Sequence, residues 1–296
     1  MNEFMDSPLV SVIMATYNWS TVLPYSIGSV LAQTFRNFEL LVVGDGCTDD
    51  SESVVRAIGD PRVQWINLPS NSGHQSAPNN EGLRRARGKY IAYLGHDDLW
   101  LPHHLSGLVQ VFSVNVDFAY SMMALVFPEG GVELRPFRFE YHPGMAIAPS
   151  SVMHQRNVID LVGEWKDYRT VRLHPENDLW ERIYEIRHSV EFVSRLSVIK
   201  FPAGLRKNAY KSRLSAEQAA WFERIQKEPD LESVELGKLI ARENRMLGSI
   251  RDKPYRYVLG EFWSETISRT KRRLSGNKKT IEQIRRYKGL ESNEQE

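Results

Sequence analysis

The sequence predicts an α/β protein built on a mostly parallel β-sheet. Short apolar segments rich in β-favouring residues alternate with segments of helical period over the first hundred residues. The chain has 296 residues, of which 42% are hydrophobic, enough for one large core or for one core plus a small appendage. Strands that alternate with helices need right-handed crossovers, and these crossovers cover both faces of the sheet with helices.

Each element of this pattern can be read from the order of residues. The expected strands are Leu9–Ala15, Phe38–Val43, Val63–Asn67 and Tyr90–Leu94. The expected helices are Val22–Gln33, Asp50–Ile58, Ser76–Arg87 and a further helix after Pro102. In the second half, Met122–Phe127 and Gly131–Leu134 predict a hairpin, and Leu196–Phe201 predicts the last strand of the core. Ser215 begins a capping-box spacing that predicts a helix through Ile225, and Leu231–Leu247 predicts an amphipathic helix.

Polar residues follow each of the first four strands. The clusters are Thr16–Asn18, Gly44–Gly46, Asn71–Gly73 and His96–Asp98. Turns rich in Gly, Asn and Asp are common between any strand and helix, so one cluster alone says little. The carboxyl ends of parallel strands meet at one edge, where sheets of this type bind ligands. Four clusters at that edge therefore predict a binding site.

Two adjacent carboxylates, Asp97 and Asp98, follow the strand Tyr90–Leu94 directly. They suit a hard divalent cation, which takes oxygen ligands and shares them with phosphates. The same pair also fits an Asp-rich turn that caps the helix after Pro102. The sequence contains neither G-x-G-x-x-G after the first strand nor G-x-x-x-x-G-K-[ST] anywhere, so two common phosphate-binding loops are excluded. A cation held by Asp97 would then neutralise a bound phosphate.

Six blocks between about Pro8 and Pro102 resemble family 2 glycosyltransferases with a GT-A fold. They occur in the expected order and read VSVIMATYN (10–18), QT (33–34), FELLVVGDG (38–46), TDDS (48–51), ARGKYI (86–91) and GHDD (95–98). The resemblance implies a sheet that binds a nucleotide-diphospho-sugar and is flanked by helices. It also implies transfer of the sugar to an acceptor, usually with inversion, and Mn²⁺ or Mg²⁺ as cofactor.

The resemblance also assigns nucleotide-binding residues. These are Thr16, Tyr17, Asn18 and Asp45. Thr16 and Tyr17 would contact the nucleoside, with the Tyr17 ring against the base. Asp45 would accept a hydrogen bond from a base N–H, which favours a UDP-sugar.

For the metal, Asp97 matches the second aspartate of the family's Asp-x-Asp element, and Asp98 would support it. The first aspartate of that element is replaced by Gly95, or by His96 if the register shifts. His96 could supply a nitrogen ligand, or it could take a supporting or structural role.

The segment Pro175–Arg182 (PENDLWER) resembles the Glu-Asp-x-Asp-Leu-Trp-x-Arg block of the family, and Glu176 aligns with the usual catalytic aspartate. A glutamate carboxylate with an unperturbed pKa of about 4.3 is ionised at neutral pH and can remove the acceptor's proton. Pro175 predicts a helix start, where the helix dipole favours that charge. Asp178 and Arg182 are expected to form a structural pair. The alternative, that Glu176 only stabilises the helix, stays open.

Composition and charge indicate the cellular compartment and the partners that we expect for this protein. A single cysteine, Cys47, excludes an internal disulfide and a multi-cysteine metal site, which is typical of a reducing compartment. No signal peptide and no apolar run near eighteen residues is present, so we expect a cytoplasmic protein. Arg269–Lys288 is strongly basic, with Glu282 as its one acidic residue. This tail could contact an anionic inner membrane face peripherally, or be a solvated helix. A nucleic-acid partner is not expected.

The predicted organisation is a GT-A domain over residues 1–203, followed by a helical extension with a basic tail over 204–296. Within the domain, 8–115 would bind the nucleotide-sugar and 116–203 the acceptor. The predicted function is metal-assisted sugar transfer, with inversion, from a UDP-sugar or related donor to a glycan or lipid-linked acceptor in polysaccharide biosynthesis. The alternative is a non-catalytic GT-A-like protein that binds nucleotide-sugars or glycans. Gly95 and the Glu-for-Asp change at Glu176 keep that alternative open.

Overall fold

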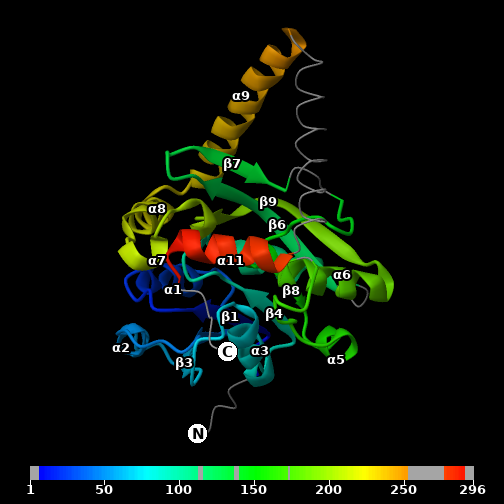
Figure 1. The fold of residues 1–296 in the computed structure, drawn as a ribbon. Coiled ribbons are helices and arrows are strands. Elements are labelled where there is room, and N and C mark those ends of the chain that lie inside the picture. The colour runs from blue at the N-terminus through cyan, green and yellow to red at the C-terminus, as the bar shows by residue number, and fades with distance from the viewer. Residues whose placement is uncertain (1–6, 113–115, 137–139, 173, 253–276, 291–296) are drawn as a thin grey trace, which may run out of the picture.

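The computed structural model describes residues 7–112, 116–136, 140–172, 174–252 and 277–290. One large sheet runs through the molecule, helices cover it, and α9 (Leu231–Asp252) projects from one end (Figure 1). The strands are β1 (Val10–Thr16), β2 (Phe38–Gly44), β3 (Val63–Asn67), β4 (Tyr90–Tyr93), β5 (Leu99–Trp100), β6 (Phe118–Val126), β7 (Val132–Arg135), β8 (Val152–Gln155) and β9 (Val190–Lys200).

The strand order is β3-β2-β1-β4-β8-β6-β9-β5, and β7 pairs with β6. The first four strands pair in parallel, as the sequence predicts. The second half adds antiparallel pairs, because β8 runs opposite to both β4 and β6 and β5 runs opposite to β9. The β6–β7 hairpin is confirmed. The sheet is therefore mixed, and the expectation of a mostly parallel sheet holds for the half formed by β1 to β4.

The helices connect and cover these strands. They are α1 (Leu23–Leu31), α2 (Ser51–Ala57), α3 (Ser76–Arg85), α4 (His104–Val111), α5 (Val158–Val162), α6 (Pro175–Arg187), α7 (Ala209–Ser212), α8 (Ala216–Lys227), α9 and α11 (Asn277–Lys288). Short 3₁₀ turns, η1 (Pro149–Ser151) and η2 (Ala203–Leu205), precede β8 and follow β9. Within the described ranges, no helix combines the length and the apolar character needed to cross a membrane.

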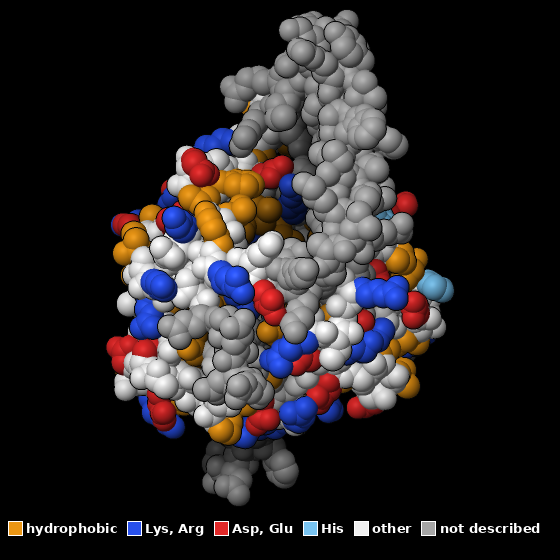
Figure 2. Space-filling model, in the orientation of Figure 1, with side chains coloured by type: hydrophobic (Ala, Val, Ile, Leu, Met, Phe, Trp, Pro, Cys, Tyr) orange, Lys and Arg blue, Asp and Glu red, His pale blue; other side chains and the backbone are white. Residues whose placement is uncertain are grey.

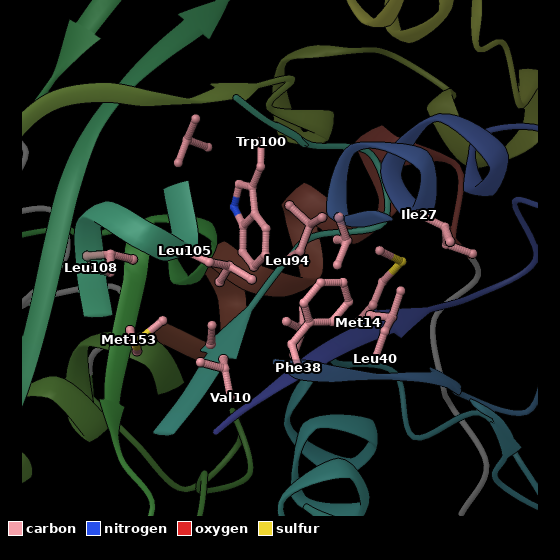
Figure 3. Close-up of a cluster of buried hydrophobic side chains, with 14 of the residues drawn as sticks. Val10, Met14, Ile27, Phe38, Leu40, Leu94, Trp100, Leu105, Leu108 and Met153 are labelled. Carbon is pink, nitrogen blue, oxygen red and sulfur yellow. The ribbon is translucent and has the colours of Figure 1, made fainter. Parts of the chain in front are cut away.

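The core lies on both faces of the sheet, as the two-residue period of a strand requires. Val10, Val12 and Met14 of β1 join a cluster with residues of α1 and α4, whereas Ile13 packs on the opposite face with residues of α3 and α6. Figure 3 shows the first cluster, in which Met14 lies near Ile27 of α1. Both faces are buried, so the strands are apolar almost throughout, and their carboxyl ends are left as the polar edge.

A third cluster joins β9 to the C-terminal helices. Leu196 and Ile199 of β9 pack with Ile225 of α8 and Leu231 of α9. Trp221 and Phe222 pack against this cluster, as predicted, and the predicted Phe262–Trp263 pair lies outside the described residues. Apolar side chains gather between β7 and α8, whereas charged side chains of both signs are scattered over the lower part of the molecule (Figure 2).

A chain of buried hydrogen bonds links β4 to β8. The indole N–H of Trp165 donates to the Tyr93 hydroxyl oxygen at 3.1 Å, and this hydroxyl lies 3.0 Å from Nε2 of His154. Nδ1 of His154 lies 2.7 Å from the carbonyl oxygen of Gln155, so a neutral ring with its proton on Nδ1 satisfies every member. Burial lowers the pKa of His154 to about 4, and the ring stays neutral at pH 7.

We predict that His154 makes the stability of the protein depend on pH. Its pKa is about 4 in the folded state, and about 6.5 is expected in the unfolded state, so the unfolded chain binds more protons between these values. Stability contributed by the neutral ring is therefore lost as the pH falls from 7 to 5, by roughly 2 kcal/mol. Urea unfolding at both pH values should show a smaller loss in His154→Gln.

The matched control is His188→Asn, because His188 is exposed at the end of α6. This variant should keep the wild-type difference in unfolding free energy between pH 7 and pH 5. An unchanged difference in His154→Gln would contradict the assignment of a buried neutral ring.

Candidate active site

A cavity of about 460 Å³ lies at the carboxyl ends of β1, β2 and β4. Among its lining residues are six that the sequence singled out: Thr16, Tyr17, Asp45, His96, Asp97 and Glu176. The first five lie at or just after the ends of strands in the parallel half, and Glu176 comes from α6. The topology thus brings the predicted nucleotide, metal and base residues to one space. Asn18 and Asp98 do not line this cavity.

One end of the cavity is built on the end of β1. The Thr16 hydroxyl lies 2.9 Å from Nδ1 of His96, and Nε2 of His96 lies 3.2 Å from the Tyr210 hydroxyl. Burial lowers the pKa of His96 to about 4, so the ring is neutral and both of its nitrogens are hydrogen-bonded. The rings of Tyr17 and Tyr210 lie 6.5 Å apart between centroids. These contacts make His96 a bridge between β1 and α7 and leave the Tyr17 ring at the cavity.

Asp45 shapes the neighbouring loop as well as lining the cavity. Its two carboxylate oxygens accept hydrogen bonds from the backbone N–H groups of Ser72 and Gly73, at 2.9 and 3.2 Å. Burial raises the pKa of Asp45 despite these hydrogen bonds. Each carboxylate oxygen can accept more than one hydrogen bond, so Asp45 retains capacity for a ligand N–H.

Asn18 is buried and is hydrogen-bonded to the loop after β2. Its side-chain oxygen accepts hydrogen bonds from the backbone N–H groups of Thr48 and Asp49, at 2.7 and 3.2 Å. Its backbone is left-handed, with φ 43°, a conformation that asparagine tolerates better than most residues. The contacts of Asn18 therefore support a role in fixing the loop after β2 instead of direct contact with a nucleotide.

Asp98 is fully buried and is already hydrogen-bonded on both oxygens. Oδ2 accepts hydrogen bonds from the Ser150 hydroxyl and, at 2.7 Å, from the Lys200 ammonium; Oδ1 accepts one from the backbone N–H of Phe201 at 3.1 Å. Burial alone would lower the pKa of Lys200, but the Asp98 and Asp97 carboxylates outweigh it and raise this pKa. Asp98 thus holds the end of β9 against the loop after β4.

Asp97 faces the cavity beside this ion pair. Burial first, and then the Asp98 carboxylate, raise the pKa of Asp97 above its ordinary value. A buried carboxylate of this kind gains from a cation placed next to it. A side chain at Gly95 has no room, because a Cβ there would lie 2.9 Å from Oδ2 of Asp98 and 3.2 Å from Oδ1 of Asp97.

The available side chains fit a metal ion that is bound partly by the protein and partly by the phosphate groups of a ligand. Among the described residues, no group of three or more His, Cys, Asp or Glu side chains is placed to hold a metal ion. Of the three predicted metal ligands, His96 and Asp98 already use their nitrogens and oxygens in hydrogen bonds within the protein. The carboxylate of Asp97 is therefore the predicted ligand that is left for a metal. Mg²⁺ is often bound by one or two carboxylates together with substrate phosphates and water, so Asp97 and a diphosphate would together suffice.

Glu176 lies in the first turn of α6, directly after Pro175. Its Oε2 atom is buried, and no hydrogen-bond partner for it occurs among the described residues. An unpaired buried carboxylate oxygen is costly, and it is available to accept a proton from a ligand. The predicted structural pair is confirmed, since Nε of Arg182 lies 2.8 Å from Oδ2 of Asp178.

Several lining residues were not foreseen from the sequence. They are Lys200, Tyr210 and the residues Ile281, Ile284, Arg285 and Lys288 of α11. The sequence shows that the tail is basic, but composition does not determine where its helix packs.

Cys47 does not line the cavity. Burial raises the pKa of its thiol to about 11, and its sulfur lies 3.6 Å from the carbonyl oxygen of Thr16.

The mixed sheet and this strand-end cavity define a protein of the GT-A class. Residues 11–156 match the family model described as "Glycosyl transferase family 2", so this part of the chain belongs to the family 2 glycosyltransferases. An uncharacterized glycosyltransferase of Rickettsia prowazekii is 34% identical over 113 residues, which cover 38% of this chain and 35% of that protein.

Another relative is named UDP-Glc:alpha-D-GlcNAc-diphosphoundecaprenol beta-1,3-glucosyltransferase WfgD, from Escherichia coli. It is 34% identical over 123 residues, which cover 41% of this chain and 48% of the relative. The similarity thus spans less than half the length of either relative.

Among solved structures, TarS residues 1–349 of S. aureus in complex with UDP-GlcNAc aligns with a TM-score of 0.57. The sequences are 18% identical, and the alignment covers 79% of this chain and 70% of that one. At this identity, the likeness supports the fold alone.

We predict that Lys200→Met destabilises the protein by about 3 kcal/mol, because it leaves the buried Asp98 carboxylate without its counter-ion. Thermal or urea unfolding measures this loss. Adding Asp98→Asn should recover part of the stability, since the uncompensated charge is then removed.

A suitable control is Lys227→Met, which removes an ion pair with Glu223 in which the lysine is 71% exposed. Its effect on the free energy of unfolding should be far smaller than that of Lys200→Met, because water screens an exposed ion pair. Equal losses in the two lysine variants would show that the Asp98–Lys200 pair does not carry this stability.

Proposed function

We propose that this protein is a glycosyltransferase that moves a sugar from a nucleotide-diphosphate-sugar to an acceptor hydroxyl. The observation that carries the proposal is one cavity lined by both Asp97 and Glu176 next to the predicted nucleotide-binding residues at the ends of β1 and β2. A cation site beside the diphosphate and a base beside the acceptor are what transfer to a hydroxyl requires. A UDP-sugar is the favoured donor, since the WfgD relative is named for UDP-Glc and TarS was solved with UDP-GlcNAc.

In this proposal the Tyr17 ring packs against the nucleotide base, and the Asp45 carboxylate accepts a hydrogen bond from an N–H group of that base. Asp97 would hold Mn²⁺ or Mg²⁺ together with the donor's phosphate oxygens, with Asp98 in support. When bound, that cation supplies charge neutralisation for the departing diphosphate.

Glu176 would take the proton of the acceptor hydroxyl while the oxygen attacks the anomeric carbon. The bond from that carbon to the diphosphate breaks with its electron pair left on the diphosphate. Attack from the face opposite the leaving group gives inversion. The unpaired Oε2 of Glu176 supports this role.

The proposed acceptor is a glycan or a lipid-linked glycan, and the proposed process is polysaccharide biosynthesis. The WfgD relative is named for a diphosphoundecaprenol-linked acceptor, which supports a lipid-linked acceptor here. With such an acceptor, the proposed setting is a cytoplasmic protein that contacts the membrane peripherally. Exposed basic residues of α11, such as Arg286, could add attraction to an anionic surface.

Calorimetric titration of UDP with and without Mn²⁺ tests the donor site. We expect metal-dependent binding by the wild type and at least tenfold weaker binding by Asp97→Ala, because Asp97 supplies the carboxylate to the metal. Mn²⁺ titrated without nucleotide should bind weakly. If UDP, dTDP and GDP all fail to bind, the proposed donor site is wrong.

Glu176→Gln tests the base. Sugar transfer from a panel of UDP-sugars to candidate acceptors, followed as UDP release, should fall at least a hundredfold while UDP affinity stays within about twofold. Glu185→Gln is the control, because Glu185 is exposed on the same helix. Nucleotide binding with no transfer by the wild type would favour the non-catalytic binding protein instead.

A further inference from the structure

One face of α11 closes the cavity at the strand ends. The residues of this helix that line the cavity are Ile281, Ile284, Arg285 and Lys288. Their spacing of three and four residues places them on one side of the helix. Arg286 and Tyr287 are exposed. Figure 1 shows α11, in red, lying across the sheet close to α7.

Backbone hydrogen bonds fix the end of α11 at this place. The backbone N–H of Asn208, just before α7, donates to the carbonyl oxygen of Tyr287 at 2.8 Å. Gly289 is left-handed, with φ 85°, and the N–H of Leu290 donates to the carbonyl of Arg285 at 3.0 Å. This is the Schellman pattern, in which a glycine ends the helix. The position of Lys288 at the cavity therefore follows from the backbone of the helix end.

Lys288 carries its ammonium among acidic and basic groups of the cavity. Burial and the charges of Lys200 and Arg285 lower its pKa, whereas Asp97 and Glu176 act in the opposite direction. Among the residues that the structure describes, none accepts a hydrogen bond from the Lys288 ammonium. A half-buried ammonium without a hydrogen-bond acceptor suits an anion with several oxygens.

The charges of the cavity suit the diphosphate of a donor. Gly95 leaves Asp97 as the carboxylate that can take a cation, and the space beside it is closed to another side chain. The guanidinium of Arg285, a buried residue, lies on the same face of α11 as Lys288. Compared with an Asp-x-Asp element, Gly95 removes one carboxylate from the cavity, and Arg285 and Lys288 add two cations. Both differences make the cavity more positive, which favours a bound diphosphate.

We propose that α11 is part of the donor site and that Lys288, with Arg285, binds the diphosphate of the nucleotide-sugar. This inference rests on the proposed function, because it names further residues for the same donor. During transfer these cations would stabilise the electron pair left on the diphosphate when its bond to the anomeric carbon breaks. No proton passes through them, since the acceptor proton goes to Glu176.

The test compares ligands with and without phosphates on the full chain. For Lys288→Gln we expect UDP to bind at least tenfold more weakly, uridine to bind as to the wild type, and Lys288→Arg to keep most of the UDP affinity. Arg286→Gln, exposed on the same helix, should leave UDP affinity within twofold. Unchanged melting temperatures show that the variants are folded.

A second measurement uses the wild type alone. UDP should protect Lys288 from amine acylation, followed by mass spectrometry, whereas Lys227, which is 71% exposed, should react equally with and without UDP. Protection of Lys288 by UDP but not by uridine supports contact with the diphosphate. Equal acylation of Lys288 in both samples contradicts it.

The possible outcomes separate the two proposals. Equal UDP affinity in Lys288→Gln would overturn this inference and leave the donor site intact, and tighter binding would instead show that α11 blocks the cavity. Inorganic pyrophosphate bound through Lys288, with no nucleoside diphosphate bound, would support the anion site and overturn the glycosyltransferase. Binding of neither pyrophosphate nor any nucleoside diphosphate would overturn both.

Discussion

The ion pair between Asp98 and Lys200 is the constraint on which the rest of the site depends. It joins the loop after β4 to the end of β9, so it ties the parallel half of the sheet, β1 to β4, to the half that carries the antiparallel strands. The Ser150 hydroxyl and the backbone N–H of Phe201 complete the contacts of the carboxylate. With Asp98 held in this way, Asp97 is turned toward the cavity. A buried charge that is fully paired can fix the relative position of two segments, whereas an unpaired buried charge would destabilise the fold.

The cavity itself holds charges that protein groups do not fully satisfy. Asp97 keeps a raised pKa, Glu176 has an unpaired buried oxygen, and Lys288 has no hydrogen-bond acceptor among the described residues. Buried polar groups of this kind cost stability and are typical of functional sites. A ligand with a diphosphate, a hydroxyl and a bound cation would satisfy all three groups at once. The same electrostatic argument thus supports donor binding, metal binding and proton removal.

The C-terminal extension is part of this arrangement. The prediction placed residues 204–296 outside the GT-A domain, and that boundary remains a prediction. Tyr210 of α7 nevertheless reaches His96, and α11 lines the cavity. Helix α8 packs on α1, where a Cβ at Gly28 would lie 2.7 Å from the Phe222 ring. The extension therefore contacts both the covering helices and the site.

The sequence by itself determined the first four strands, their helices and the polar edge, because local periodicity and turn residues act over a few positions. It also determined that Thr16, Asp45 and Asp97 would share that edge, since parallel strands end together. Only the tertiary structure decided that Asp98 faces inward to Lys200, that Asn18 supports a loop, and that the basic tail reaches the cavity. Those outcomes depend on contacts between residues distant in the chain, 30 positions apart for Asn18 and Thr48 and 102 for the Asp98–Lys200 pair. Composition and spacing contain no record of such distant pairings, because they are set by how the whole chain packs.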